Sequence, residues 1–140
     1  MPLDDCCQKT VVTVAPDASV HDVIGLMEGK NVGCVVVTEG KKPVGIITDR
    51  DIVIRVVSKN GNTRAVKAKD AMTKNPFCLP GSTGVFDALK QMKGKRFRRI
   101  PVTDAKGNLS GIITIDDFTR LLVKELSFIS SIIEEQSPGF

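Results

Sequence analysis

A repeated seven-residue segment constrains the fold more than any other feature of this chain. Residues 45–51 read Gly-Ile-Ile-Thr-Asp-Arg-Asp, and residues 111–117 read Gly-Ile-Ile-Thr-Ile-Asp-Asp. Upstream residues match in the same order: Val20, Asp22, Met27, Gly29 and Lys30 correspond to Val85, Asp87, Met92, Gly94 and Lys95. Two long copies are not a solenoid, so they predict a pseudo-two-fold pair of equivalent units.

Hydrophobic spacing changes in the same way along each copy. Helical spacing covers residues 20–27 and 85–92, and Gly29 and Gly94 are predicted to end these helices. Short apolar strands follow at 34–37 and 100–102, and second strands at 44–47 and 109–113. Second helices are predicted to start near Asp49 and Ile115. This order predicts an α/β (α+β) fold.

The boundaries follow from the repeat and from a polar stretch around Asn60-Gly61-Asn62. We expect repeat 1 at 5–58, a linker at 59–69, repeat 2 at 70–126, and a helical extension and tail at 127–140. An apolar stripe continues into the extension: Phe118, Leu122, Leu126, Ile129 and Ile133. Extra core burial is one explanation for this stripe. Packing against a second subunit is the favoured one, because one small sheet cannot cover so long a stripe.

Net charge and composition limit the classes of binding partner. The chain has 140 residues, a formal net charge of +4 and a pI near 9.0, which favours nucleotides, nucleic acid or acidic protein surfaces. Trp and Tyr are absent, which argues against an aromatic surface for single-stranded nucleic acid. We expect no membrane partner and a cytoplasmic location, because no apolar run is long enough to span a bilayer and the first residues do not resemble a signal peptide.

Neither catalysis nor metal binding is predicted. The chain has no Cys-x-x-Cys, and His21 is its single histidine. Cys34 and Cys78 are expected to be buried as small apolar side chains. Phosphate-loop, dinucleotide-loop and hydrolase motifs are absent from the sequence. We therefore expect no catalytic residue, no metal site and no catalytic cofactor.

The repeated motif places a Thr at the junction between a strand and a helix, with an Asp three residues later. One interpretation is a capping box, in which Thr48 with Asp51, and Thr114 with Asp117, close the helix start. The other is a ligand site. Backbone N–H groups and the helix dipole attract an anion, the Thr hydroxyl donates to phosphate, and the carboxylate accepts from two ribose hydroxyls. A sugar phosphate would satisfy both side chains.

Basic residues gather before the second copy's first long strand: Lys93, Lys95, Arg96, Arg98 and Arg99. They could form a solvated face or a nucleic-acid patch. Arg98 and Arg99 also lie next to the second copy's motif in this reading, and arginine binds phosphate through two parallel hydrogen bonds. The first copy has Gly33 and Cys34 at these positions. We therefore expect two pockets that differ in phosphate affinity, with the arginines at the second motif.

Together these residues resemble a tandem pair of CBS domains of the stand-alone type, named after cystathionine β-synthase and known as a Bateman module. The resemblance rests on Asp70-Ala-Met72, Arg98-Arg-Ile-Pro-Val102 and the two Gly-Ile-Ile-Thr-x-x-Asp segments, and runs from about Asp5 to Leu126. It implies two β-α-β-β-α repeats packed through their sheets, with two symmetry-related clefts that bind AMP, ADP, ATP or another adenosyl ligand.

By motif position, the resemblance implies specific ligand contacts. Thr48 and Thr114 would contact phosphate, and Asp51 and Asp117 the ribose. Further contacts are implied for Ile46 and Ile112 near the adenine, for Arg98 and Arg99 at phosphate, and for Lys9, Thr10, Met72 and Thr73 in the first strands, which line the opposite copy's cleft.

Three functions remain open from the sequence. The leading one is a non-catalytic, nucleotide-sensing regulatory module that forms a homodimer and signals to an effector protein. The second is a ligand-free interaction and dimerisation module, and the third is a nucleic-acid-binding protein.

Overall fold

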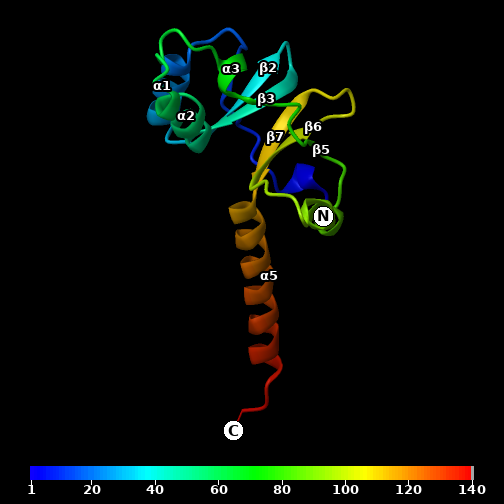
Figure 1. The fold of residues 1–140 in the computed structure, drawn as a ribbon. Coiled ribbons are helices and arrows are strands. Elements are labelled where there is room, and N and C mark those ends of the chain that lie inside the picture. Colours follow the sequence, from blue (N-terminus) through cyan, green and yellow to red (C-terminus); the bar gives the residue numbers. More distant parts are fainter. Residues whose placement is uncertain (140) are drawn as a thin grey trace.

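The computed structural model describes residues 1–139 and contains two similar α/β units that meet through their sheets (Figure 1). The first unit contains β1 (Thr13–Val14), α1 (Val20–Lys30), β2 (Cys34–Glu39), β3 (Lys42–Thr48) and α2 (Asp49–Arg55). The second contains β5 (Leu79–Pro80), α4 (Val85–Met92), β6 (Arg99–Thr103), β7 (Leu109–Thr114) and α5 (Ile115–Gln136). The predicted α/β order is confirmed in both copies.

Local signals explain where α1 begins and ends. The Ser19 side chain accepts a hydrogen bond from the Asp22 backbone N–H, which caps the first turn. The helix continues through Gly29 and ends at Asn31, whose φ of 53° is left-handed. The helix thus ends one residue after Gly29, close to the predicted position, and Asn31 in place of the glycine adopts the left-handed conformation that ends it. Gly94 does lie just beyond α4, with a φ of 82°.

Each sheet combines one parallel and one antiparallel pairing of its own strands. β1 pairs in parallel with β2, and β2 pairs antiparallel with β3. In the second unit, β5 pairs in parallel with β6, and β6 antiparallel with β7. The segment between the units adds η2 (Val57–Lys59), α3 (Ala68–Ala71) and β4 (Thr73–Lys74), and η1 (Leu3–Asp5) lies near the N-terminus.

The segments that precede the two copies are exchanged between the units. β4, which follows the linker, pairs with β3 of the first unit. Gln8, which precedes the first copy, pairs with Ile112 in β7 of the second unit. The cores show the same exchange, because Ala68 and Ala71 pack in the first core and Leu3 packs in the second. Each unit is thus completed by residues that lie before the other copy in the chain.

Strand alternation sends side chains to two different layers. Val35, Val37 and Ile47 face the helices in the core of the first unit. Cys34 and Val36 face the other way and pack with Ile112 of the second unit, with Ile46 beside them. This small apolar layer between the sheets holds the two units together.

The last helix leaves the body of the protein. Phe118 is buried in the second core, near the start of α5. Beyond it the helix projects away from both units (Figure 1). Among the residues that the structure describes, no helix combines the length and the apolar character needed to cross a bilayer.

Candidate functional site

Both repeated motifs form complete capping boxes. At the start of α2, the Asp51 backbone N–H donates to Thr48 Oγ1 at 3.1 Å, and the Thr48 backbone N–H donates to Asp51 Oδ2 at 2.9 Å. The pair Thr114 and Asp117 repeats this geometry at α5, with the same two distances. The structural interpretation of the motif is therefore correct at both junctions, and it holds Asp51 beside the end of β3 and Asp117 beside the end of β7.

The capping contacts change how an anion could be bound at α2. The first three backbone N–H groups of the helix donate to Gly33 O, Asp49 Oδ1 and Thr48 Oγ1. These groups do not point freely into solution, so the expected anion site made of helix N–H groups is not formed here. Within residues 1–139, however, the Thr48 hydroxyl only accepts, and its own proton remains available to a phosphate oxygen.

A cleft of about 290 Å³ lies at the first motif. Thr48 and Asp51 line one side of it, and Ile46 and Pro101 contribute apolar wall. Four guanidinium groups surround it: Arg50, Arg96, Arg98 and Arg99. We call this hollow the first cleft. It combines a hydroxyl donor, a carboxylate acceptor, an apolar wall and concentrated positive charge.

A hollow of about 330 Å³ lies at the second motif, and we call it the second cleft. It is lined by Thr114, Ile112 and Asp116, together with residues 31–34 from the start of β2. Its two basic side chains are Arg99 and Arg120. The second cleft thus has two arginines with one aspartate, whereas the first has four arginines with Asp49 and Asp51, so the second is the less basic of the two by one formal charge.

The expected placement of Arg98 and Arg99 beside the second motif is confirmed, because Arg98 Nη2 lies 3.8 Å from Asp116 Oδ1 and Arg99 is the register partner of Thr114. The structure adds that the arginine side chains also reach the first cleft. Arg96 and Arg98 line the first cleft, and Arg99 reaches both. The cause is the packing of the sheets, because the residues that precede β6 cross toward Thr48 while residues 31–34, which precede and begin β2, cross toward Thr114. The two pockets do differ in charge, in the sense opposite to the one expected.

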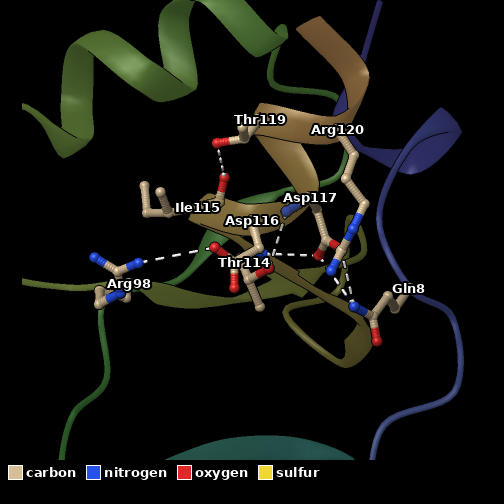
Figure 2. A network of polar contacts seen from close by, with 8 residues as sticks. All are labelled: Gln8, Arg98, Thr114, Ile115, Asp116, Asp117, Thr119 and Arg120. Atoms are coloured by element: carbon tan, nitrogen blue, oxygen red, sulfur yellow. Dashed lines mark hydrogen bonds and ion pairs between the residues drawn. The ribbon is translucent and has the colours of Figure 1, made fainter. Parts of the chain in front are cut away.

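The two carboxylates also differ in their partners. Asp117 Oδ1 receives Gln8 Nε2 at 3.1 Å and Arg120 Nη1 at 3.4 Å, as Figure 2 shows. Asp51 Oδ1 has a looser contact, with Arg55 Nη2 at 3.7 Å. Asp51 lines the first cleft, whereas Asp117 is not among the residues that line the second. The Asp51 carboxylate thus has fewer side-chain partners than that of Asp117, and it is the one that lines its cleft.

The remaining predicted site residues divide between the clefts and the surrounding structure. Thr73, from the start of the second repeat, lines the first cleft, and Thr10, from the start of the first repeat, lines the second cleft. Each therefore lines the cleft of the opposite copy, as the resemblance implied. Lys9 lies near Asp4 instead, with 3.6 Å between Nζ and Oδ1. Met72 packs against the first core and against Gly45, so it supports β3 without lining the first cleft.

The comparisons with known proteins decide the family. The family model described as the CBS domain matches residues 3–58 and again 68–124. The chain belongs to the CBS domain family. An uncharacterized protein of Methanopyrus kandleri is 34% identical over 137 residues, which cover 97% of this chain and 68% of that protein. Inosine-5'-monophosphate dehydrogenase of Methanocaldococcus jannaschii is 36% identical over 84% of this chain, which spans 23% of that enzyme.

Solved structures show the same arrangement of a CBS pair. The CBS-pair protein CBSX2 of Arabidopsis thaliana superposes with a TM-score of 0.79 at 27% identity, over 90% of this chain and 96% of that one. A second structure is CBSX2 in complex with AMP, with a TM-score of 0.75 at 28% identity over 88% of this chain and 96% of that one. The tandem CBS module predicted from the sequence is confirmed.

Two phenylalanines of this CBS pair were missed by the sequence analysis. Phe77 and Phe97 both line the first cleft, and their rings stack with centroids 5.8 Å apart. Lys95 Nζ lies 4.9 Å from the centroid of the Phe77 ring, within the range of a cation–π contact. Phe97 lies inside the arginine run, which was the available signal. Phe77 lies outside every repeated motif.

Cys34, which lines the second cleft, has a thiol of low reactivity. Burial raises the pKa of the Cys34 thiol to about 11, and the Arg99 charge only partly opposes this rise. Burial likewise raises the pKa of Cys78 to about 11. Because the thiolate is the nucleophilic form, both side chains are poor nucleophiles at neutral pH.

Proposed function

We propose that this CBS pair is a non-catalytic sensor that binds an adenosine nucleotide in its first cleft. The observation that carries the proposal is the meeting of Thr48, Asp51 and the three arginines of residues 96–99 around one hollow with an apolar wall. These groups come from both units. A ligand that contacts all of them would bridge the two repeats.

Each part of a nucleotide has a matching group in the first cleft. Asp51 Oδ1, whose one side-chain contact is with Arg55 at 3.7 Å, can accept from the two vicinal hydroxyls of ribose. The Thr48 hydroxyl and the guanidinium groups can donate to phosphate, and arginine does so with two parallel hydrogen bonds. Ile46, Phe97 and Pro101 offer the apolar contact that a purine base requires. Similarity to CBSX2, whose AMP complex has been solved, supports the same ligand class.

Sensing also requires a partner that reads the bound state. A ligand changes the output only if it has unequal affinity for two states of the module. A nucleotide that draws the arginines of the second unit toward Thr48 of the first would favour one relative position of the units. The proposed partners are a second copy of the chain and an effector protein that contacts both units.

Isothermal titration calorimetry with AMP, ADP and ATP tests this proposal. Asp51→Asn should weaken binding by about tenfold or more, because hydrogen bonds to an ionised acceptor contribute about 1.5–3 kcal/mol. The asparagine oxygen can still accept the Thr48 N–H, so the cap of α2 is retained. Asp117→Asn is the matched control and should leave the affinity of the first cleft nearly unchanged.

Two outcomes of the titration contradict the proposal. Absence of binding heat with all three nucleotides at millimolar concentration removes nucleotide sensing and leaves an interaction module. Equal affinities for the wild type and Asp51→Asn, with loss in Asp117→Asn, would transfer the site to the second cleft.

A further inference from the structure

Residues 93–98 connect α4 to β6 and carry four positive charges in six positions. The cations are Lys93, Lys95, Arg96 and Arg98. Charges this close repel one another, and a segment of this kind left to itself extends into water. Three consecutive residues of the segment, 96–98, nevertheless line the first cleft. The segment therefore needs a contact that holds it against the body of the protein.

Backbone hydrogen bonds hold the two ends of this segment but not its middle. At its start, the Lys95 N–H donates to the carbonyl of the last residue of α4, and at its end the Arg98 carbonyl accepts from the first residue of α5. The Arg98 side chain also faces Asp116 across 3.8 Å, but both side chains are exposed, and such ion pairs contribute little. Within residues 1–139, the backbone groups of Arg96 and Phe97 have no hydrogen-bond partner in the chain.

The ring of Phe97 supplies the missing contact in the middle of the segment. It stacks on Phe77 with centroids 5.8 Å apart and planes inclined by 10°, within the range of attractive ring pairs. Lys95 Nζ lies 4.9 Å from the centroid of the same Phe77 ring. Two side chains of the segment thus contact one ring that belongs to a different part of the chain.

Phe77 is itself fixed by both units. Its partly buried side chain packs against the core of the second unit. Two residues earlier, the Asn75 N–H donates to the Val44 carbonyl in β3 of the first unit at 3.2 Å, directly after β4 pairs with the same strand. Phe77 therefore provides a firm support for the Phe97 ring, at the point where the chain passes from one unit to the other.

The support matters because Arg96 and Arg98 directly flank Phe97 in the sequence. Arginine binds phosphate through two parallel hydrogen bonds, which require a defined direction of the guanidinium group. A donor that is already held in place also avoids the loss of conformational freedom that binding otherwise causes. A fixed Phe97 therefore prepares the guanidinium groups on either side of it for an anionic ligand.

We propose that Phe77 is a positioning residue of the first cleft, whose ring holds Phe97 and thereby directs Arg96 and Arg98 toward the phosphate groups of a ligand. The inference rests on the proposed function and deepens it, because it makes the contribution of this ring grow with the number of phosphates on the nucleotide. The anchoring of residues 93–98 itself does not require a ligand, so it can be measured separately.

Limited proteolysis without nucleotide tests the anchoring. Trypsin cleaves after lysine and arginine, and its rate at residues 93–98 follows the population in which the segment has left the body. Phe77→Leu keeps an apolar side chain against the second core and removes the ring, so it should raise this rate about fivefold. Phe77→Tyr keeps the ring and should cleave as slowly as the wild type. Cleavage after Arg64, in the linker, is the internal reference and should not change.

Calorimetry with ATP, AMP and adenosine tests the effect on phosphate. Phe77→Leu should lower the affinity for ATP about fivefold and the affinity for AMP by less. It should leave the affinity for adenosine nearly unchanged, because adenosine has no phosphate for the arginines to bind. The matched control is Phe86→Leu, which removes an exposed ring that also has a lysine nearby, Lys90, but does not line the first cleft. This control should change neither the proteolysis nor the affinities.

Three outcomes overturn the positioning role. One is equal cleavage of residues 93–98 in the wild type and Phe77→Leu. Another is a rise of the same factor after Arg64, because the ring would then support the whole fold. The third is an equal loss of affinity for ATP and adenosine, which would mean that the ring contacts the base. A wild type that binds no nucleotide contradicts the proposed function instead, and the proteolysis still decides whether Phe77 anchors the segment.

Discussion

The two clefts start from the same strand-to-helix junction and differ in what surrounds it. In the first cleft, the Asp51 carboxylate faces a hollow ringed by arginines. In the second, Gln8 and Arg120 already engage the Asp117 carboxylate. The difference comes from segments outside the repeated motif, which cross from one unit to the cleft of the other. The sequence repeat therefore predicts the same strand-to-helix junction in both units, but it does not predict that the two clefts have the same lining residues.

Removing two of the three arginines that line the first cleft and not the second should have the largest effect on nucleotide binding. Arg96→Ala with Arg98→Ala should lower the affinity of the first cleft for ATP about a hundredfold, because each lost charge-assisted bond contributes roughly 1.5 kcal/mol or more. Calorimetry measures this change. The control is Lys93→Ala, which removes a neighbouring positive charge that does not line the cleft. A similar loss in the control would show that general charge attracts the ligand.

Equivalent glycines should respond unequally to a methyl group. A Cβ at Gly111 would lie 2.6 Å from Cys7 Sγ and 2.8 Å from the Gln8 carbonyl oxygen, which belongs to the backbone, while a Cβ at Gly45 would meet side-chain atoms of Met72 only, from Sδ down to Cβ. Backbone yields less readily than a methionine side chain. Gly111→Ala should cost about 2–3 kcal/mol of unfolding free energy and Gly45→Ala about 1 kcal/mol, as overpacking typically does. Urea denaturation compares them, and equal costs would contradict this difference in rigidity.

The smallest effect is expected from the side chain that both clefts share. The Arg99 guanidinium and the Asp49 carboxylate both lie next to Gly33, since a Cβ at Gly33 would be 3.2 Å from Arg99 Nη2 and 3.3 Å from Asp49 Oδ2. Arg99→Ala should lower the affinity for AMP at any cleft that binds it, by about tenfold or less at each. Amide shifts of Thr48 and Thr114 during an NMR titration with AMP report the clefts separately. A change confined to one amide would assign Arg99 to that cleft alone.

Local pattern was sufficient to predict much of the fold. The order of helices and strands, both capping boxes and the projecting apolar stripe follow from periodicity and from Thr-x-x-Asp spacing. That Arg98, beside Asp116 as expected, also lines the first cleft did not follow, because it depends on how the two sheets pack together. The Phe77–Phe97 stack was missed for the same reason, since the two rings come from different segments that meet only in the folded chain. Sequence patterns thus predicted the elements and the chemistry of the motif, while tertiary packing determined which cleft received the charge.

The exchanged lead-in segments have a consequence for how the chain is made on the ribosome. When the first repeat emerges, β3 still lacks β4, so its edge stays unpaired until Lys74 has been synthesised. The N-terminal residues remain unpaired for even longer, because Gln8 can pair with Ile112 only after Ile112 has been synthesised. Contacts so distant in sequence form slowly. Neither half of the gene should therefore yield a stable product by itself, and trimming the extreme N-terminus should damage the C-terminal half of the molecule.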